Sequence, residues 1–338
     1  MILTKTRMSV LLTHPDGQVD VHQLRCGKKH VVVRVREERT YVPRRECDTS
    51  YPVELVRAIL NIKGPAWVCD EIMRDEDPTY IERHLLFGIL AYVPETAFVG
   101  RKILDFGCGC GASTMVLARM FPQTQIIGVD LDADFLDIAR HRASHYGLRN
   151  VHFYLSPDGS QLPKGIERFP FVILNGVYEH LLPHERQVLM PKLWSLMKPG
   201  GILFVTETPH TYFPVERHTS GLPLINYMPS MTALALARRF SRNVQADESW
   251  QSLLRRGIRG GTEAEIMDNL VRQCADRPIL LQPSRLGLRD AIDLWSAMYG
   301  PKCSASAMRL AVLLLRLTRA CLGIALVHSL SLAIKKGP

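Results

Sequence analysis

The stretch ILDFGCGCGAST, residues 103–114, decides the fold. An apolar run reaches Asp105, three glycines then alternate with two cysteines, and a helical pattern follows. Glycines at 107, 109 and 111 permit a tight turn and let a ligand approach the backbone, while the free N–H groups of the next helix attract polar or anionic groups. The stretch therefore predicts a strand, a glycine loop and a helix that bind a nucleotide-like ligand.

Strand-like and helix-like segments alternate around this loop. Short apolar runs predict five strands, over residues 102–106, 125–130, 151–155, 171–175 and 201–207. Helical patterns lie over residues 112–121, 134–146 and 183–198, and Pro191 either kinks the last helix or starts a second one. This alternation predicts an α/β fold with a doubly wound, mostly parallel sheet.

The composition is that of a folded globular protein. Of 338 residues, 46% are hydrophobic and 22% charged, and the net charge is +9. Such an excess favours anionic partners, but no dense basic run appears, so scattered surface charge is the simpler interpretation. The eight cysteines form no CxxC pair, so we expect no metal site. Charged residues interrupt the N-terminus too early for a secretory signal, so we expect a cytoplasmic protein with free thiols.

Both ends of the chain extend the alternating region. Residues 1–98 show short strands followed by helices, and helices are expected over 263–274, 287–299 and 305–321. Residues 320–334 carry no charge but are shorter than the roughly 20 residues that span a bilayer. Peripheral membrane contact through residues 305–334 is one interpretation. We favour a closing edge strand over residues 326–335, because apolar residues alternate there with small ones.

Acidic residues around the loop help to decide between two nucleotide-like ligands, a dinucleotide and S-adenosylmethionine. Asp105 can hold the ammonium group of a methionine moiety, whereas it would repel a pyrophosphate. Asp130, which ends the next strand, is placed to accept hydrogen bonds from ribose hydroxyls, while Asp132 is a candidate helix cap. Asp158 either accepts from an adenine amino group or only forms an Asx-turn. The pattern favours S-adenosylmethionine over a dinucleotide.

These motifs resemble the class I S-adenosylmethionine-dependent methyltransferases, in the small-molecule group that includes ubiquinone-biosynthesis-like enzymes. The similarity covers residues 99–210. ILDFGCGCGAS matches the glycine loop, GVDLD the ribose-binding strand end, SPDGSQLP the adenine-contacting turn, and NGVYEHL with LMKPGGILFVTE the fourth and fifth strands. LSLAIKK, residues 330–336, resembles the last strand. Two features depart from the family pattern, namely Pro170 near the start of the fourth strand and Cys110 in the loop.

The resemblance implies a seven-stranded, Rossmann-like sheet with an N-terminal extension and helical C-terminal insertions. We divide the chain into an extension that covers the acceptor (1–98), a cofactor-binding core (99–210) and a lid with the final strands (211–338). The residues expected to bind S-adenosylmethionine, and its product S-adenosylhomocysteine, are Asp105, Gly107, Cys108, Gly109, Gly111, Asp130, Leu131, Asp158, Gly159 and Asn175.

Catalysis requires few protein groups in such a reaction. Methyl transfer is an in-line displacement from a sulfonium, so alignment alone supplies much of the acceleration. A hydroxyl acceptor also needs a general base, for which His180 and His210 are the candidates, with His218 as a third. His180 is equally well interpreted as a structural histidine of its loop.

The leading interpretation is a methyltransferase whose acceptor is a small molecule, such as a lipid-like compound, a sugar or a secondary metabolite. Aromatic residues in the segment 211–262 suggest a lid over that acceptor. An RNA or DNA methyltransferase is the alternative, favoured by the charge but not by the sequence NGVY, which lacks the N/D-PP-Y/F motif of base-amine methylation. A non-catalytic cofactor-binding protein of the same fold is the third interpretation.

Overall fold

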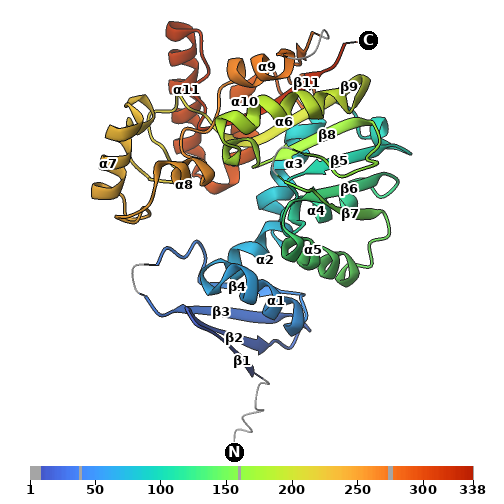
Figure 1. Ribbon diagram of the computed structural model, residues 1–338, viewed down its shortest axis with the longest axis vertical. Helices are drawn as coiled ribbons and strands as arrows, with labels where there is room; N and C mark the ends of the chain where they lie inside the picture. The colour runs from blue at the N-terminus through green and yellow to red at the C-terminus, as the bar shows by residue number, and fades with distance from the viewer. Residues whose placement is uncertain (1–8, 38–39, 159–160, 273–276, 338) are drawn as a thin grey trace, which may run out of the picture.

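A seven-stranded sheet forms the centre of the computed structural model, which describes residues 9–37, 40–158, 161–272 and 277–337 (Figure 1). The strand order is β10-β11-β9-β8-β5-β6-β7. The strands are β5 (Lys102–Phe106), β6 (Gln125–Asp130), β7 (Val151–Leu155), β8 (Phe169–Asn175), β9 (Met197–Pro209), β10 (Ile279–Leu280) and β11 (Ser329–Lys335). β5 to β9 run parallel, whereas β11 is antiparallel to β9 and to β10.

Helices cover both faces of this sheet. Alternate residues of each strand point to opposite sides, so Leu104 belongs to the core under α6 and α9, while Ile103 belongs to the core under α3 and α4. The helices are α3 (Arg83–Leu90), α4 (Ala112–Met120), α5 (Ala133–His145), α6 (Pro183–Ser195) and α9 (Glu263–Val271). Burial on both faces explains why the strands read as continuous apolar runs.

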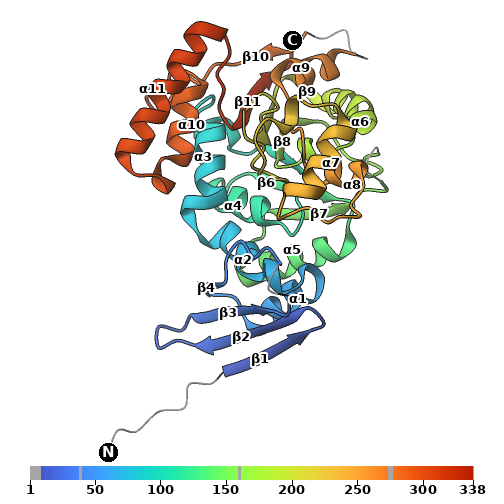
Figure 2. The ribbon, with the colours of Figure 1, turned by 90° about the vertical axis from the view of Figure 1, so that its left-hand side faces the viewer.

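The N-terminal residues form a smaller unit with its own core. Four antiparallel strands, in the order β1-β2-β3-β4, pack against two helices. The elements are β1 (Ser9–His14), β2 (Gly17–Gln23), β3 (Lys29–Val35), β4 (Glu46–Thr49), α1 (Val53–Lys63) and α2 (Val68–Glu76). Figures 1 and 2 show this unit at one end of the molecule, where α1 and α2 meet α5.

The segment after β9 forms a helical insert, and further helices precede β11. The insert contains α7 (Ser230–Phe240) and α8 (Trp250–Arg255), which share a small apolar core. Helix α10 (Ala291–Tyr299) packs on α3, and α11 (Ala305–Leu322) packs on α10. Single turns complete the chain: η1 (Pro65–Trp67), η2 (Pro78–Glu82), η3 (Glu95–Phe98), η4 (Tyr178–His180), η5 (Ile225–Tyr227) and η6 (Gly300–Lys302).

The structure confirms the predicted α/β sheet and corrects one strand. Residues 326–335 do contain a strand, β11, but it is not the edge of the sheet, because Ile279 and Leu280 of β10 pair with its outer side. A two-residue strand is too short to show a periodicity in the sequence. Pro191 lies inside the single helix α6, so it does not start a second helix. Within the described parts of the chain, we find no helix with the length and apolar character needed to cross a membrane.

A buried arginine joins the N-terminal unit to the sheet. Arg142 of α5 is fully buried, and its Nη2 lies 3.0 Å from Glu71 Oε2 and donates to the Glu71 carbonyl at 2.9 Å. Its Nη1 lies 3.6 Å from Oδ1 of Asp75, a carboxylate that also accepts from the Tyr51 hydroxyl at 2.5 Å. Both acidic residues belong to α2, so this cluster ties α2 to α5.

Replacing this arginine should weaken the junction. We expect Arg142→Leu to lower the free energy of unfolding by about 3–5 kcal/mol, because it removes a fully buried cation that pairs with two buried carboxylates. Arg140→Leu, on the same helix, removes only a half-exposed pair with Asp137 and should cost less than about 1 kcal/mol. Urea unfolding followed by circular dichroism measures both, and equal costs would contradict the importance of the junction.

Candidate functional site

The glycine loop joins β5 to α4 in the conformation that the sequence predicts. Its three glycines have positive φ angles, of 72° at Gly107, 54° at Gly109 and 82° at Gly111. A Cβ on Gly111 would lie 2.6 Å from the Ala139 Cβ, so this glycine permits close packing of α5. A Cβ on Gly109 would have no described atom within 4 Å, so the backbone there faces open space.

Asp105 is buried beneath the loop and holds the start of α4. Its Oδ2 accepts hydrogen bonds from the Ser113 hydroxyl at 2.8 Å and the Thr114 hydroxyl at 2.6 Å. Burial raises the pKa of Asp105 to about 6, although both hydrogen bonds act in the opposite direction. Asp105 therefore fixes the first turn of α4, next to the glycine loop.

The other predicted cofactor residues lie at the carboxyl ends of the next strands. Asp130 Oδ2 accepts from the Gly109 N–H at 2.8 Å, which ties the end of β6 to the loop. Leu131, beside it, exposes 62% of its surface. Asp158 is exposed in its turn and accepts from the Gln161 side chain at 2.6 Å. Gly159 lies outside the described residues.

Asp132 and Asn175 have different structural partners. The Asp132 side chain caps α5 by accepting from the N–H groups of Asp134 and Phe135, as the sequence predicts. Asn175 ends β8, and its Oδ1 accepts from the Thr206 hydroxyl of β9 at 2.8 Å. Asn175 therefore lies where two parallel strands end together.

The two loop cysteines are buried and point to different parts of the core. The Cys108 sulfur lies against Gly128 of β6, where an added Cβ would meet it at 3.1 Å. Cys110 belongs to the apolar core of the N-terminal unit. Burial raises the pKa of both thiols, to about 12 for Cys110, so neither is a reactive thiolate at neutral pH. Both side chains pack inside the protein.

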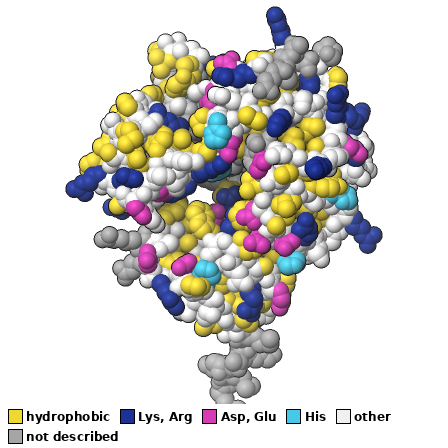
Figure 3. All heavy atoms as spheres, viewed as in Figure 1, with side chains coloured by type: hydrophobic (Ala, Val, Ile, Leu, Met, Phe, Trp, Pro, Cys, Tyr) yellow, Lys and Arg dark blue, Asp and Glu magenta, His cyan; other side chains and the backbone are white. Residues whose placement is uncertain are grey.

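A cavity of about 510 Å³ opens beyond the ends of β8 and β9. Figure 3 shows a hollow near the centre of this face, with basic, acidic and histidine side chains around it. The N-terminal unit and η2 contribute Arg74 and Tyr80, while α10 contributes Trp295 and Tyr299. The cavity is therefore built by segments that are far apart in the sequence, and polar and apolar groups contribute about equally to its walls.

Glu207 is held in this cavity in a strained backbone conformation. It ends the regular part of β9 with a φ of 64°, which a side chain with a Cβ rarely adopts. Its Oε1 lies 2.5 Å from His84 Nδ1 and accepts from the Tyr299 hydroxyl at 2.8 Å. Strain of this kind is concentrated at functional sites, so Glu207 belongs among the candidate residues.

Both predicted catalytic histidines line the cavity. Nδ1 of His180 lies 2.8 Å from the Arg255 carbonyl oxygen, and Nδ1 of His210 lies 3.2 Å from that of Val327. Burial lowers the pKa of both, to about 4 for His180, so both are neutral at pH 7. A carbonyl only accepts, so each Nδ1 carries the proton and each Nε2 keeps a lone pair.

The comparisons with known proteins concern the sheet and its loops. Residues 103–201 match the family described as a methyltransferase domain. These residues therefore form a methyltransferase domain. This domain belongs to a family that uses S-adenosylmethionine, in agreement with the motifs around the glycine loop.

Relatives of this methyltransferase domain match about half of the chain or less. The chain is similar to a carboxy-S-adenosyl-L-methionine synthase of Hydrogenovibrio crunogenus, with 32% identity over 48% of this chain and 64% of the relative. It is also similar to a trans-aconitate 2-methyltransferase of Methylobacterium radiotolerans, with 34% identity over 38% of this chain and 45% of the relative. It therefore spans less than two thirds of the length of either relative.

A solved structure, PKMT2 from Rickettsia typhi, shares 26% identity with this chain. The match covers 39% of this chain and 26% of that one, with a TM-score of 0.32.

Asp105→Asn tests the buried carboxyl of the methyltransferase domain. A raised pKa means that the folded protein holds the Asp105 proton more tightly than the unfolded chain, so stability falls as pH rises from about 4 to about 6. The variant keeps an oxygen acceptor for Ser113 and Thr114 and lacks this titration. We expect its free energy of unfolding, relative to the wild type, to rise by up to about 3 kcal/mol between pH 4 and pH 7.

Urea unfolding at several pH values measures this difference, and a constant offset from the substitution cancels in the comparison. Parallel pH profiles for the two proteins would show that the Asp105 pKa is not raised.

Proposed function

We propose that this protein is an S-adenosylmethionine-dependent methyltransferase that acts on a polar small-molecule acceptor. One observation carries the proposal: the cavity adjoins the glycine loop. Asn175 and Gly176 line the cavity, and the next residue, Val177, packs so closely on the loop that a Cβ on Gly107 would lie 2.7 Å from it. A cofactor on the loop and an acceptor in the cavity would therefore meet at the end of β8.

The residues at the loop suit the parts of this cofactor. When bound, S-adenosylmethionine supplies a methyl group on a sulfonium, which is a good leaving group. The open backbone at Gly109 allows close approach, and we assign the Asp130 carboxylate, which ends β6 beside the loop, to the ribose hydroxyls. The exposed side chain of Leu131 offers apolar surface to the adenine, and we assign Asp158 to its amino group.

The walls of the cavity favour an acceptor that carries oxygen. Three arginines, Arg74, Arg217 and Arg259, line it together with three glutamates, histidines and tyrosines. Such groups recognise carboxylates, phosphates and hydroxyls. Among the three acceptor classes considered from the sequence, a sugar or a polar secondary metabolite fits this lining better than a lipid-like compound does.

Neutral histidines supply the base that a hydroxyl acceptor needs. His210 is buried in the cavity wall, and its Nε2 is free to accept a proton while Nδ1 is oriented by Val327. In the proposed step, the acceptor oxygen gives its proton to this Nε2 and forms a bond to the methyl carbon. The bond between that carbon and sulfur breaks, and S-adenosylhomocysteine leaves with the electron pair.

Calorimetric titration tests the cofactor assignment. We expect S-adenosylmethionine and S-adenosylhomocysteine to bind and NAD to give no signal. Asp130→Ala should weaken binding of the adenosyl ligands at least about tenfold, because hydrogen bonds to a charged group contribute about 1.5–3 kcal/mol. Asp132→Ala is the matched control: it removes the cap of α5, costs about 1 kcal/mol of stability and should leave affinity nearly unchanged.

Tight NAD binding without a response to the adenosyl ligands would overturn the assignment. Equal losses of affinity in Asp130→Ala and Asp132→Ala would show that Asp130 acts only through stability.

Labelled methyl transfer tests the acceptor class. The protein is incubated with cell extract and methyl-labelled S-adenosylmethionine, and the extract is then separated into lipid, RNA and small-molecule fractions. We expect the label in polar small molecules, and His210→Gln should reduce its incorporation about 10²–10⁴-fold if the acceptor is a hydroxyl. Label confined to RNA would favour the nucleic-acid alternative instead.

A further inference from the structure

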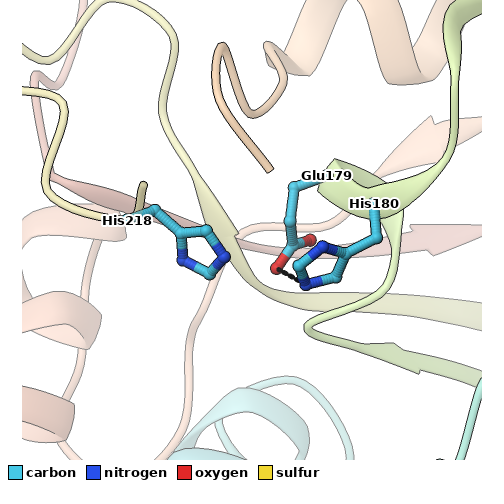
Figure 4. A group of neighbouring side chains, drawn as sticks. All are labelled: Glu179, His180 and His218. Carbon is cyan, nitrogen blue, oxygen red and sulfur yellow. Dashed lines mark ion pairs between the residues drawn. The ribbon is translucent and has the colours of Figure 1, made fainter. Parts of the chain in front are cut away.

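Three side chains that bind metals well in proteins meet at the edge of the cavity. Glu179 and His180 come from the turn η4, and His218 comes from the insert after β9. One potential ligand atom of each lies within 4.8 Å of those of the other two, and His180 Nε2 is 3.8 Å from Glu179 Oε1 (Figure 4). The sequence predicts no metal site, because it offers no CxxC pair and no repeated His/Cys spacing.

His180 is oriented as a metal ligand would be. Its Nδ1 donates to the Arg255 carbonyl at 2.8 Å, so the lone pair of Nε2 points toward Glu179 and His218. Histidines that bind metals commonly donate their other ring N–H to a backbone carbonyl or carboxylate in this way, which fixes the tautomer. The tautomer required for binding is therefore already set by the fold.

Glu179 is a buried carboxyl that forms no ion pair with a Lys or Arg side chain among the described residues. It is 1% exposed, and in the described parts of the chain no Lys or Arg nitrogen lies within 4.0 Å of its carboxylate oxygens, although Arg186 donates to its backbone carbonyl at 3.3 Å. Its contacts are the Thr208 hydroxyl, 3.4 Å from Oε2, and the neutral His180. Buried carboxylates are costly unless they are paired or coordinate a metal, so this position favours a cation.

The insert backbone brings His218 against Glu179. A Cβ on Gly257 would lie 2.6 Å from His218 Cδ2 and 3.1 Å from Glu179 Cγ, and Gly257 has a φ of 95°. Only glycine fits this position, because it lacks a Cβ and tolerates a positive φ. The close approach holds together Glu179 and His218, which are separated by 39 positions in the sequence.

We propose that Glu179, His180 and His218 bind a divalent transition-metal ion, with Zn²⁺ as the best-suited ion. Two imidazoles and one carboxylate are a ligand set of catalytic zinc sites, in which a fourth position stays open. The open position would face the cavity, where it binds an oxygen of the acceptor and lowers the pKa of its hydroxyl. This role rests on the proposed function, whereas the binding of the metal does not.

Zinc titration of the full-length, tag-free protein tests the site. The protein is first treated with a chelator and then titrated with Zn²⁺ in the absence of any adenosyl ligand. We expect one Zn²⁺ per chain, and Glu179→Gln and His218→Ala should each weaken binding at least about tenfold, since even changes to outer-shell partners cost 10–100-fold. A Co²⁺ titration followed by visible absorption reports on the same ligands.

Two control variants separate this site from other zinc ligands. His210→Ala removes a histidine of the same cavity, and Cys303→Ser removes an exposed thiol at its wall. Both should bind Zn²⁺ as the wild type does, and circular dichroism checks that each variant is folded.

The absence of stoichiometric Zn²⁺ binding, or unchanged binding in His218→Ala, would overturn the proposal. Zinc binding without S-adenosylmethionine binding would instead leave the site intact and remove only its proposed role in methyl transfer.

Discussion

In a parallel sheet, the carboxyl ends of all strands lie at the same edge, and this constraint places the chemistry of the protein. β5, β6, β8 and β9 run parallel. Their ends carry the glycine loop, Asp130, Asn175 and Glu207, respectively. Helices cover both faces of the sheet, so polar groups can gather only where the strands end. The candidate site is therefore a direct consequence of the strand directions.

The polar groups near this edge are buried, and the fold supplies partners for most of them. Asp105 accepts from two hydroxyls of α4, and Glu207 is held by His84 and Tyr299. Unpaired buried groups are costly, so these contacts fix the positions of the side chains that carry them. Arg142 is likewise buried and paired, and it holds the N-terminal unit, whose Arg74 lines the cavity, against the sheet domain.

The cofactor side and the acceptor side of the site come largely from different parts of the chain. Residues 103–201, which match the methyltransferase domain family, contain the glycine loop and the turn η4. Much of the cavity lining comes from outside this range, including Arg74, Tyr80, Glu207 and His218. The relatives therefore inform the cofactor side, while the acceptor side depends on the geometry of this chain.

Local sequence alone determined much of the fold and the cofactor side. The first three strands of the sheet, β5 to β7, begin and end at the predicted residues, because a buried strand needs a continuous apolar run and the loop needs glycines at positive φ. The sequence did not predict β10, because two residues are too few to show a periodicity. β10 pairs with β11 and makes it an internal strand.

Only the tertiary structure decided which distant residues meet. The sequence suggested His180, His210 and His218 separately, as candidate bases. The path of the insert joined His218 to Glu179 and His180, and the packing of α3 and α10 around Glu207 completed the cavity. Periodicity records which face of an element is buried but not which other segment covers it, so such contacts appear only in the folded chain.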